Sequence, residues 1–375
     1  MCNKEDDFDW DAYEKAVKEH PLYPAEQCYR HIEEVMESDI IRLYDSIDYF
    51  LFQDIDYARI ISNMPMWVAN AGIGPESNCT KDWYEKLRNK ETHPIFGRFV
   101  YHYDLWGKVA AMQDRLSAVI MFMKQFYDIV PCRAKYNVDE YTSISRCGGM
   151  RETEAHMLLN SIFVAYASVF DILSKIAVEQ FEFAEYDFSR YRKMKSADVI
   201  YKKSLRNIDS SLKATGMLFS EPPVIRKIET FRNEFVHNGP WDLRCSIYTT
   251  TVNEEPADII IYSPDMDELG NFISSGSRNK FYSQGNRINL QLPDLINEAT
   301  AVLRNTINQI SNLYQIGITQ SVNNEYTEEC MMAIEQYYAS LENNYCIIPF
   351  SLILHSDSVC DILRSMVETS MSRRA

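Results

Sequence analysis

The stretch from Glu229 to Trp241 reads Glu-Thr-Phe-Arg-Asn-Glu-Phe-Val-His-Asn-Gly-Pro-Trp and predicts the end of an amphipathic helix. The helix is expected to begin at Pro222-Pro223, because a proline in the first turn loses no needed hydrogen bond. Asn238-Gly239-Pro240 is expected to end it, since glycine tolerates a left-handed cap and proline cannot continue the helix. Its apolar residues recur at helical spacing and predict one buried face: Val224, Ile225, Ile228, Phe231 and Phe235.

The polar residues at the end of this helix form the candidate site. Asn233 and His237 are four residues apart and share a face, and Arg232 directly precedes Asn233. His237 falls in the last turn, where unpaired carbonyl groups favour a protonated imidazole. The helix is therefore expected to present a guanidinium, a carboxamide and an imidazole together. The alternative is purely structural, with Arg232 paired to Glu229 or Glu234 and His237 a helix-terminal histidine.

The spacing of arginine and histidine alone is not specific, because three of the seven histidines have an arginine five residues before them. Arg88 to His93 encloses polar residues before Pro94 and is typical of the end of a short surface helix. Arg151 to His156 encloses acids and a threonine, which are typical of a first helical turn. Only Arg232 to His237 encloses core residues within an amphipathic helix.

The stretch Phe231-Arg-Asn-Glu-Phe-Val-His-Asn238 resembles the signature of the HEPN superfamily (higher eukaryotes and prokaryotes nucleotide-binding). The resemblance implies a bundle of four or five helices that often dimerises so that two such motifs face each other. Many members are metal-independent ribonucleases in toxin–antitoxin, phage-defence or RNA-processing systems, whereas others keep the fold without the activity. The tyrosine-rich tail of the toxins that are modified by nucleotidyltransferase antitoxins is missing after Asn238.

The chemistry that the resemblance implies is attack of an RNA 2′-hydroxyl on the adjacent phosphodiester, without metal. An imidazole such as His237 has a suitable unperturbed pKa for activating the hydroxyl. Arg232 is planar and permanently charged, and it suits stabilisation of the phosphorane. Asn233 suits a hydrogen bond to phosphate or to the imidazole. The competing interpretation is a non-catalytic helical scaffold or a nucleotide- or nucleic-acid-binding module.

A long apolar segment, Glu152 to Phe183, predicts a helix inside the bundle. Asp171 lies on its narrow polar stripe and is four residues before Lys175, so the two are expected to pair with each other. The alternative gives Asp171 a supporting role in the candidate site, where it would orient Arg232 or His237.

The net charge of −16 argues against broad, non-specific binding of nucleic acid. Residues 190–206 are the exception, with seven bases against the single acid Asp198. Such a strip is a candidate for phosphate or RNA contacts, and its common alternative is a solvated linker or helix face. The candidate contact residues are Arg192, Lys193, Lys195, Lys202, Lys203 and Arg206.

The predicted fold is mainly α, a HEPN-like helical bundle with a small β insertion and an additional N-terminal helical region. Residues 1–150 form that N-terminal region, with helices at about 25–62 and 104–130. Residues 151–320 form the bundle, and residues 321–375 add C-terminal helices, near 325–343 and 356–369, that pack on it. A helix is also expected at 196–215, and another from Pro293 to Ile316.

The β insertion is expected at about 243–292, where the apolar pattern changes to period two. Leu243–Val252 and Ile259–Tyr262 predict a hairpin, and Ile288–Leu292 predicts a third strand. Residues 131–149 are expected to be irregular, with a domain boundary at Cys147-Gly148-Gly149.

No metal or cofactor is expected, because no histidines and cysteines fall at zinc-binding spacing and no phosphate-loop or dinucleotide signature occurs. The nine cysteines lack a Cys-x-x-Cys pair and are typical of reduced thiols in a cytoplasmic protein. The acidic N-terminus does not resemble a signal peptide, and the apolar runs are short for a membrane span. The expected partners are RNA, a second copy of the chain through the bundle, and an inhibitor or partner protein.

Overall fold

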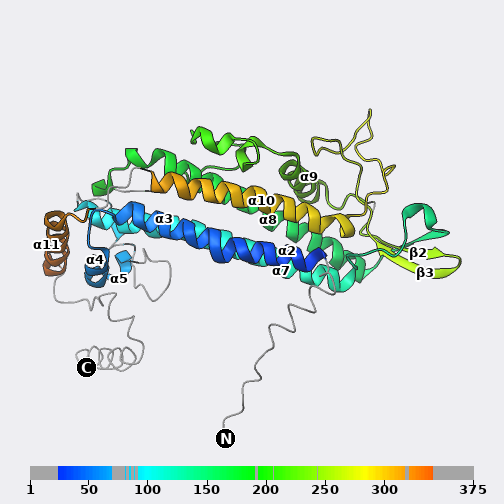
Figure 1. Cartoon of the computed structure of the whole chain (residues 1–375), viewed down its shortest axis with the longest axis horizontal. Helices are drawn as coiled ribbons and strands as arrows, with labels where there is room; N and C mark the ends of the chain where they lie inside the picture. The colour runs from blue at the N-terminus through cyan, green and yellow to red at the C-terminus, as the bar shows by residue number, and fades with distance from the viewer. Residues whose placement is uncertain are drawn as a thin grey trace, which may run out of the picture. The chain divides into compact units, whose positions relative to one another are not determined.

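The computed structural model describes residues 24–69, 81, 84–85, 88, 92–190, 193–205, 207–242, 244–316 and 321–340. These residues are mainly helical and include a small three-stranded antiparallel sheet, so the predicted mainly α fold with a small β insertion is confirmed (Figure 1). The helix predicted at 356–369 lies outside the described residues.

The α-helices are α2 (Pro24–Glu34), α3 (Ile40–Phe52), α4 (Tyr57–Asn63), α5 (Met66–Ala69), α7 (Pro94–Ile129), α8 (Met150–Glu182), α9 (Pro223–Asn238), α10 (Ile288–Gln315) and α11 (Asn324–Ser340). A π-helical turn, η1 (Val35–Asp39), joins α2 to α3. The strands are β1 (Ser143–Cys147), β2 (Ile247–Val252) and β3 (Glu255–Ile260). Short 3₁₀ turns occupy Val138–Glu140, Phe183–Glu185, Phe188–Arg190, Ser210–Lys213 and Leu218–Ser220.

The described residues fall into two compact units, each built from three separate segments. Unit 1 takes its residues from Met1–Asp39, Gln113–Phe170 and Ser211–Thr306, and unit 2 from Ile40–Met112, Asp171–Ser210 and Ile307–Ala375. Three of the five limits between the units fall within α7, α8 and α10. They do not follow the consecutive regions 1–150, 151–320 and 321–375, and that division stays a prediction.

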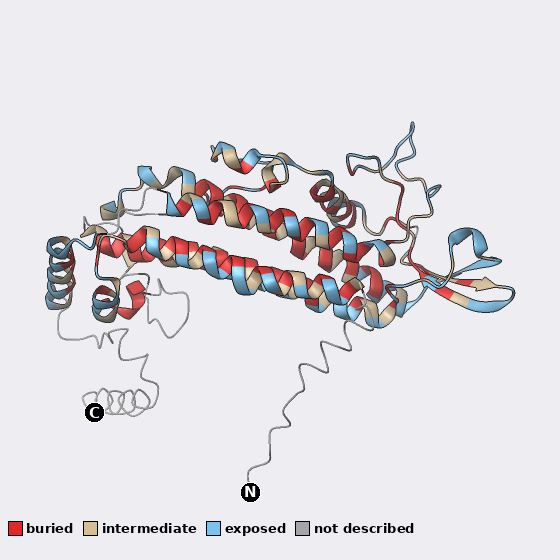
Figure 2. Ribbon diagram, viewed as in Figure 1, coloured by how far each residue is buried: buried red, intermediate tan, exposed pale blue. Residues whose placement is uncertain are grey.

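The core of unit 1 includes the predicted apolar face of α9. Val224, Ile225, Ile228, Phe231 and Phe235 are all buried, as Figure 2 shows in red along this helix. Phe163 of α8 stacks on Phe231 with ring centroids 4.9 Å apart. Burying a side chain of this size contributes roughly 1.5–3 kcal/mol, so packing rather than helix propensity holds α9 in place.

Helix α10 begins at Ile288, and the third strand expected at Ile288–Leu292 is wrong. The alternation of apolar and polar residues covers only five positions here, and its buried ends, Ile288 and Leu292, are four residues apart, which is also the spacing of one helical face. Pro293 lies inside α10 and leaves the carbonyl of Asn289 without its helical partner. The hydroxyl of Tyr127 donates to that carbonyl at 3.1 Å, and the side chain of Asn289 binds the N–H of Ile261 at 3.0 Å. These contacts satisfy the polar groups around the proline.

The sheet has the order β1-β2-β3 with antiparallel pairing throughout. A β2–β3 hairpin is present as predicted, but β3 begins at Glu255, four residues before the expected start at Ile259. The turn residues Asn253 and Glu254 both have positive φ, as two-residue hairpins of this kind require. The third strand is β1, which lies in the segment expected to be irregular. Four of its five residues are exposed, so no apolar alternation marks this strand in the sequence.

Unit 2 contains hydrogen-bonded polar groups both within one of its segments and between two of them. The Nε2 atom of His102 lies 2.7 Å from Oδ1 of Asp48, which also accepts a hydrogen bond from the Trp106 indole at 2.8 Å. Glu179 of α8 is fully buried and binds the hydroxyl of Tyr101 at 3.2 Å and the backbone N–H of Ser196 at 2.6 Å. A buried carboxylate needs such partners to offset its desolvation.

Among the described residues, one helical stretch, Met150–Glu185, is long and apolar enough to cross a membrane. Of its most apolar window, 61% is buried within the protein. This burial indicates the core helix of a soluble protein and agrees with the predicted position of Glu152–Phe183 inside the fold.

Candidate functional site

Helix α9 positions the candidate site much as the sequence predicts. It starts with Pro222 at the N-cap and ends at Gly239, whose φ is 85°. Arg232 is half-buried, whereas Asn233 and His237 are exposed. The helix therefore buries its apolar face and carries the three polar side chains towards solvent.

The three polar residues do not form one tight cluster. Nη1 of Arg232 donates a hydrogen bond to Oδ1 of Asn233 at 2.7 Å. On a helix with 3.6 residues per turn, Asn233 and His237 are about 40° apart, whereas Arg232 and His237 are about 140° apart. Asn233 thus lies between the guanidinium and the imidazole, and it holds the guanidinium on its own side of the helix.

Glu234, one of the two acids in this stretch, pairs with Lys280 and not with Arg232. Glu234 is buried, and its carboxylate pairs with the ammonium group of Lys280. The other carboxylate oxygen accepts a hydrogen bond from the Asn238 side chain at 2.8 Å. The ion pair of Glu234 with Lys280 therefore connects the last turn of α9 to the segment that follows β3. Arg232 contacts Asn233 instead.

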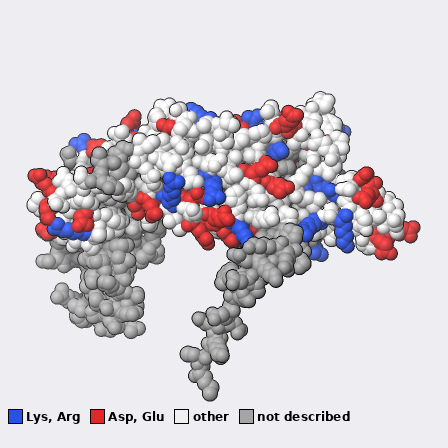
Figure 3. All heavy atoms as spheres, viewed as in Figure 1, with Lys and Arg blue, Asp and Glu red and all other residues white. Residues whose placement is uncertain are grey.

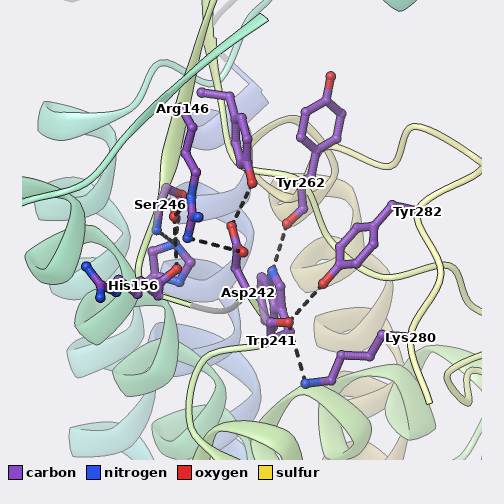
Figure 4. A network of polar contacts seen from close by, with 10 residues as sticks. Arg146, His156, Trp241, Asp242, Ser246, Tyr262, Lys280 and Tyr282 are labelled. Carbon is purple, nitrogen blue, oxygen red and sulfur yellow. Dashed lines mark hydrogen bonds and ion pairs between the residues drawn. The ribbon is translucent and has the colours of Figure 1, made fainter. Parts of the chain in front are cut away.

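Trp241 follows the end of α9 and makes further contacts between this helix and the segment after β3. Its buried ring packs on Phe231 and Phe235, with centroid distances of 5.2 and 4.8 Å. Its carbonyl oxygen accepts a hydrogen bond from the Tyr282 hydroxyl at 2.9 Å and lies 3.5 Å from Nζ of Lys280. Figure 4 shows Tyr282 and Lys280 both pointing towards Trp241.

A second group of polar contacts connects β1 with the chain after α9 (Figure 4). Asp242 accepts a hydrogen bond from the Tyr248 hydroxyl at 2.7 Å and lies 3.6 Å from Nη2 of Arg146. Nε of Arg146 also donates to the hydroxyl of Ser246 at 2.7 Å. Burial raises the pKa of Tyr248 to about 12, and the hydrogen bond to Asp242 adds to this effect.

His156 belongs to the core. It is the histidine that follows Arg151 by five residues, the same spacing as Arg232 and His237. It lies in α8, is fully buried, and its Nε2 is 3.2 Å from the backbone N and 3.0 Å from the backbone O of Ser246. Burial lowers the pKa of His156, and the backbone contact with Ser246 offsets part of that change. The imidazole is therefore neutral at pH 7 and structural.

Asp171 binds the backbone N–H of Tyr201 at 2.7 Å, and both residues belong to unit 2. Within the described part of the chain no ion pair joins Asp171 to Lys175, so the expected pairing is wrong. Arg232 and His237 belong to unit 1. The orienting role of Asp171 stays a prediction.

The helix predicted at 196–215 is wrong, because this segment forms turns and short 3₁₀ pieces. Lys202 and Ser204 have positive φ, and Ile200 and Lys203 form an isolated antiparallel bridge. Serine, aspartate and asparagine side chains compete with helical hydrogen bonds, and they recur here at positions 196, 198, 204, 207 and 209–211.

Of the six basic residues predicted to contact phosphate, Arg192 and Arg206 lie outside the described residues. Lys193 pairs with Asp198 at 3.5 Å, and Lys195 pairs with Glu185 at 2.5 Å. Lys202 lies over the ring of Tyr201 at 5.3 Å, and Lys203 is exposed. On the face drawn in Figure 3, basic residues are interspersed with acidic ones. Contact of these basic residues with phosphate stays a prediction.

Sequence patterns did not predict a cavity of about 340 Å³ beside Asp242, with Tyr248, Tyr262 and Tyr282 in its wall. Two further cavities in unit 1 lie near Lys227 and near Tyr29. None of these three cavities is lined by Arg232, Asn233 or His237. These tyrosines come from separate segments, and the chain contains 24 tyrosines. No local sequence pattern therefore predicts that these three lie around one cavity.

Comparisons of the chain with protein-family models, with curated proteins and with solved structures gave no match. The likeness to the HEPN superfamily therefore rests on the eight residues Phe231 to Asn238 and their place at the end of α9. The described residues contain no group of three or more histidine, cysteine or acidic side chains arranged to hold a metal ion, and the five cysteines described are free thiols.

Proposed function

We propose that the C-terminal end of α9 is the site of a metal-independent endoribonuclease, with His237, Arg232 and Asn233 as its catalytic residues. The observation that supports this proposal is that all three side chains reach solvent at the end of a helix whose opposite face is buried. An RNA strand can therefore approach them without any rearrangement of the core.

In the proposed reaction the imidazole of His237 removes the proton of an RNA 2′-hydroxyl. The 2′-oxygen attacks phosphorus, the bond to the 5′-oxygen breaks, and that oxygen takes up a proton. The products are a 2′,3′-cyclic phosphate and a 5′-hydroxyl. Arg232 stabilises charge on the phosphorane, because a guanidinium matches two phosphate oxygens at once, and Asn233 holds the guanidinium in position.

A second copy of the chain supplies the acid in this proposal. Arg232 and His237 are separated around α9, and one imidazole cannot both accept and donate a proton in a single step. Two copies facing each other through the bundle would bring a second His237 to the leaving oxygen. Light scattering at working concentration tests this pairing, since a monomer that retains activity contradicts it.

The setting of the proposed activity is cytoplasmic, in a phage-defence or toxin-type system in which an inhibitor or partner protein holds the enzyme silent. The acidic net charge limits unspecific RNA binding. Phosphate contacts by the exposed residues Lys202 and Lys203, which belong to unit 2, are a separate proposal. The alternative function is a non-catalytic scaffold or nucleotide-binding module. It is favoured by the finding that none of the three cavities described above is lined by Arg232, Asn233 or His237.

Incubation of the purified protein with end-labelled RNA in EDTA tests the proposal. Cleavage by the wild type is expected to yield 2′,3′-cyclic phosphate ends and to be lost in Arg232→Ala and His237→Ala. Arg226→Ala is the matched control, because Arg226 lies on the same helix but outside the motif and pairs with Glu221 at 3.3 Å. Cleavage that survives both motif substitutions contradicts the proposed site.

A further inference from the structure

The cavity beside Asp242 has the walls of an aromatic cage. Tyr248 of β2, Tyr262 after β3, and Tyr282 of the following loop surround a space of about 340 Å³, with aliphatic Val138 and Ile144 beside them. The rings of Tyr248 and Tyr262 have centroids 5.2 Å apart and planes inclined at 69°. The cavity is therefore bounded by rings that face different directions.

Two of the three tyrosine hydroxyls have hydrogen-bond partners, which fix the positions of their rings. Tyr248 donates to Asp242, and Tyr282 donates to the carbonyl of Trp241. Burial, together with the carboxylates of Asp242, Glu234 and Asp265, raises the pKa of Tyr282 to about 12. All three rings are thus neutral phenols near pH 7.

The charges around the cavity are distributed unevenly. Asp242 lies in its wall and pairs at 3.6 Å with Arg146, which does not line the cavity, and Asp265 is buried nearby with only neutral hydrogen-bond donors, from Ser283 and Gln284, on its carboxylate, so two carboxylates stand against one guanidinium. Burial raises the pKa of Tyr262, and the guanidinium of Arg287 is near enough to offset part of that rise. Arg287 does not line the cavity, and it donates its hydrogen bonds to the carbonyl oxygen of Tyr136 and the hydroxyl of Tyr141. The side of the cavity at Asp242 and Tyr282 therefore favours positive charge.

We propose that this cavity binds a methylated ammonium group, held by the faces of Tyr248, Tyr262 and Tyr282 and by the charge of Asp242. Aromatic faces attract cations through their quadrupole, and rings on several sides of one space suit a quaternary ammonium. An unpaired nucleobase fits less well, because it stacks on one ring and then meets a ring inclined at 69° by its edge. This site shares no residue with the candidate ribonuclease site.

The sharpest test compares choline with its uncharged carbon isostere, in which carbon replaces the quaternary nitrogen, by calorimetry on the full chain. Choline is expected to bind at least about tenfold more tightly, because the two molecules have the same shape and differ in charge. Equal affinities would overturn the proposal and leave an apolar cavity. Absence of choline binding combined with binding of adenosine would overturn it in favour of a base-binding site.

Variants of Tyr262, which forms one wall of the cavity, test whether choline binds there. Tyr262→Phe keeps the ring and is expected to bind choline within about twofold of wild type, whereas Tyr262→Ala removes a ring and weakens binding about tenfold. Tyr49→Ala, at an exposed tyrosine of unit 2, is the control, and circular dichroism verifies folding. Choline binding unaffected by Tyr262→Ala contradicts the site.

The source of the ammonium group is resolved by a second comparison. A peptide with trimethyllysine and the same peptide with unmodified lysine are titrated beside choline. Preference for the trimethylated peptide over both identifies a protein ligand, and preference for choline identifies a free small molecule; both outcomes support the cage. Tighter binding of the unmodified peptide than of either methylated ligand would overturn it.

Discussion

The indole nitrogen of Trp241 donates a hydrogen bond across 2.7 Å to the backbone carbonyl oxygen of Tyr262. The same indole ring packs on Phe231 and Phe235 of α9. One residue thus connects the candidate ribonuclease helix with the segment after β3 that lines the tyrosine cavity. The integrity of both proposed sites depends on this attachment.

Trp241→Phe keeps an aromatic ring but removes the indole donor and leaves the carbonyl of Tyr262 unsatisfied. We expect a loss of about 1–3 kcal/mol in the free energy of unfolding, measured by urea denaturation. Tyr282→Phe removes a hydrogen bond from a side chain that is 44% exposed, where water can replace it, and is expected to cost less. A larger loss for Tyr282→Phe than for Trp241→Phe would contradict this account.

The pair Glu234 and Lys280 is expected to couple strongly. Lys280→Met leaves a carboxylate whose side chain is 9% exposed without its cation, at a cost of about 2 kcal/mol in unfolding free energy. In the double variant with Glu234→Gln that penalty should largely disappear. A double-mutant cycle measures the coupling, and additive effects within about 0.5 kcal/mol would show that the pair contributes little.

Gly270 packs against the start of α9 so closely that no side chain fits. Its φ is 87°, and an added Cβ would lie 2.6 Å from the carbonyl oxygen of Pro223 and 2.9 Å from the backbone N of Lys227. Gly270→Ala is therefore expected to lower the unfolding free energy by about 2 kcal/mol or more. Gly276→Ala, with positive φ but open space around it, should cost about 1 kcal/mol. Equal effects would argue against the close approach.

Lowering the pH should destabilise the segment from Tyr262 to Arg287, because Asp265 becomes protonated. Burial acts to raise the pKa of Asp265, but hydrogen bonds from the Ser283 hydroxyl and from the N–H groups of Gln284 and Ser283 outweigh it and lower the pKa. A lowered pKa stabilises the fold above the ordinary value of about 4, and the stabilisation is lost as the pH falls through the folded-state pKa.

Comparison of wild type with Asp265→Asn measures this contribution. Between about pH 5 and pH 3 the wild type should lose more unfolding free energy than the variant, whose side chain does not titrate. Asp139→Asn, at an exposed residue, serves as the control for loss of one carboxylate. Parallel acid profiles for wild type and Asp265→Asn would contradict the role of Asp265.

Much of the fold could be predicted because its long helices carry a sustained apolar period. The helix ending at Asn238 is correct in bounds and in buried face, since its capping residues and its packing residues agree. The strand β1 and the turns at 193–205 could not be predicted in this way. The strand is mostly exposed, and the basic segment contains polar side chains whose preference for turns competes with a helical pattern.

The candidate site was only partly predictable for a related reason. Exposure of Asn233 and His237 follows from their place opposite Phe231 and Phe235 on one helix. The partner of Glu234 could not be predicted, because Lys280 lies 46 positions later in the chain and no local sequence pattern indicates their contact. The tyrosine cavity likewise depends on segments that only tertiary structure brings together.

The central claim is that His237 is the general base of an RNA-cleaving site at the end of α9. The most direct measurement is the ratio of RNA cleavage rates of wild type and His237→Ala in EDTA, at equal concentration and with equal folding. The account predicts a ratio on the order of 10²–10⁴. A wild type that cleaves RNA at the same rate as His237→Ala would contradict it.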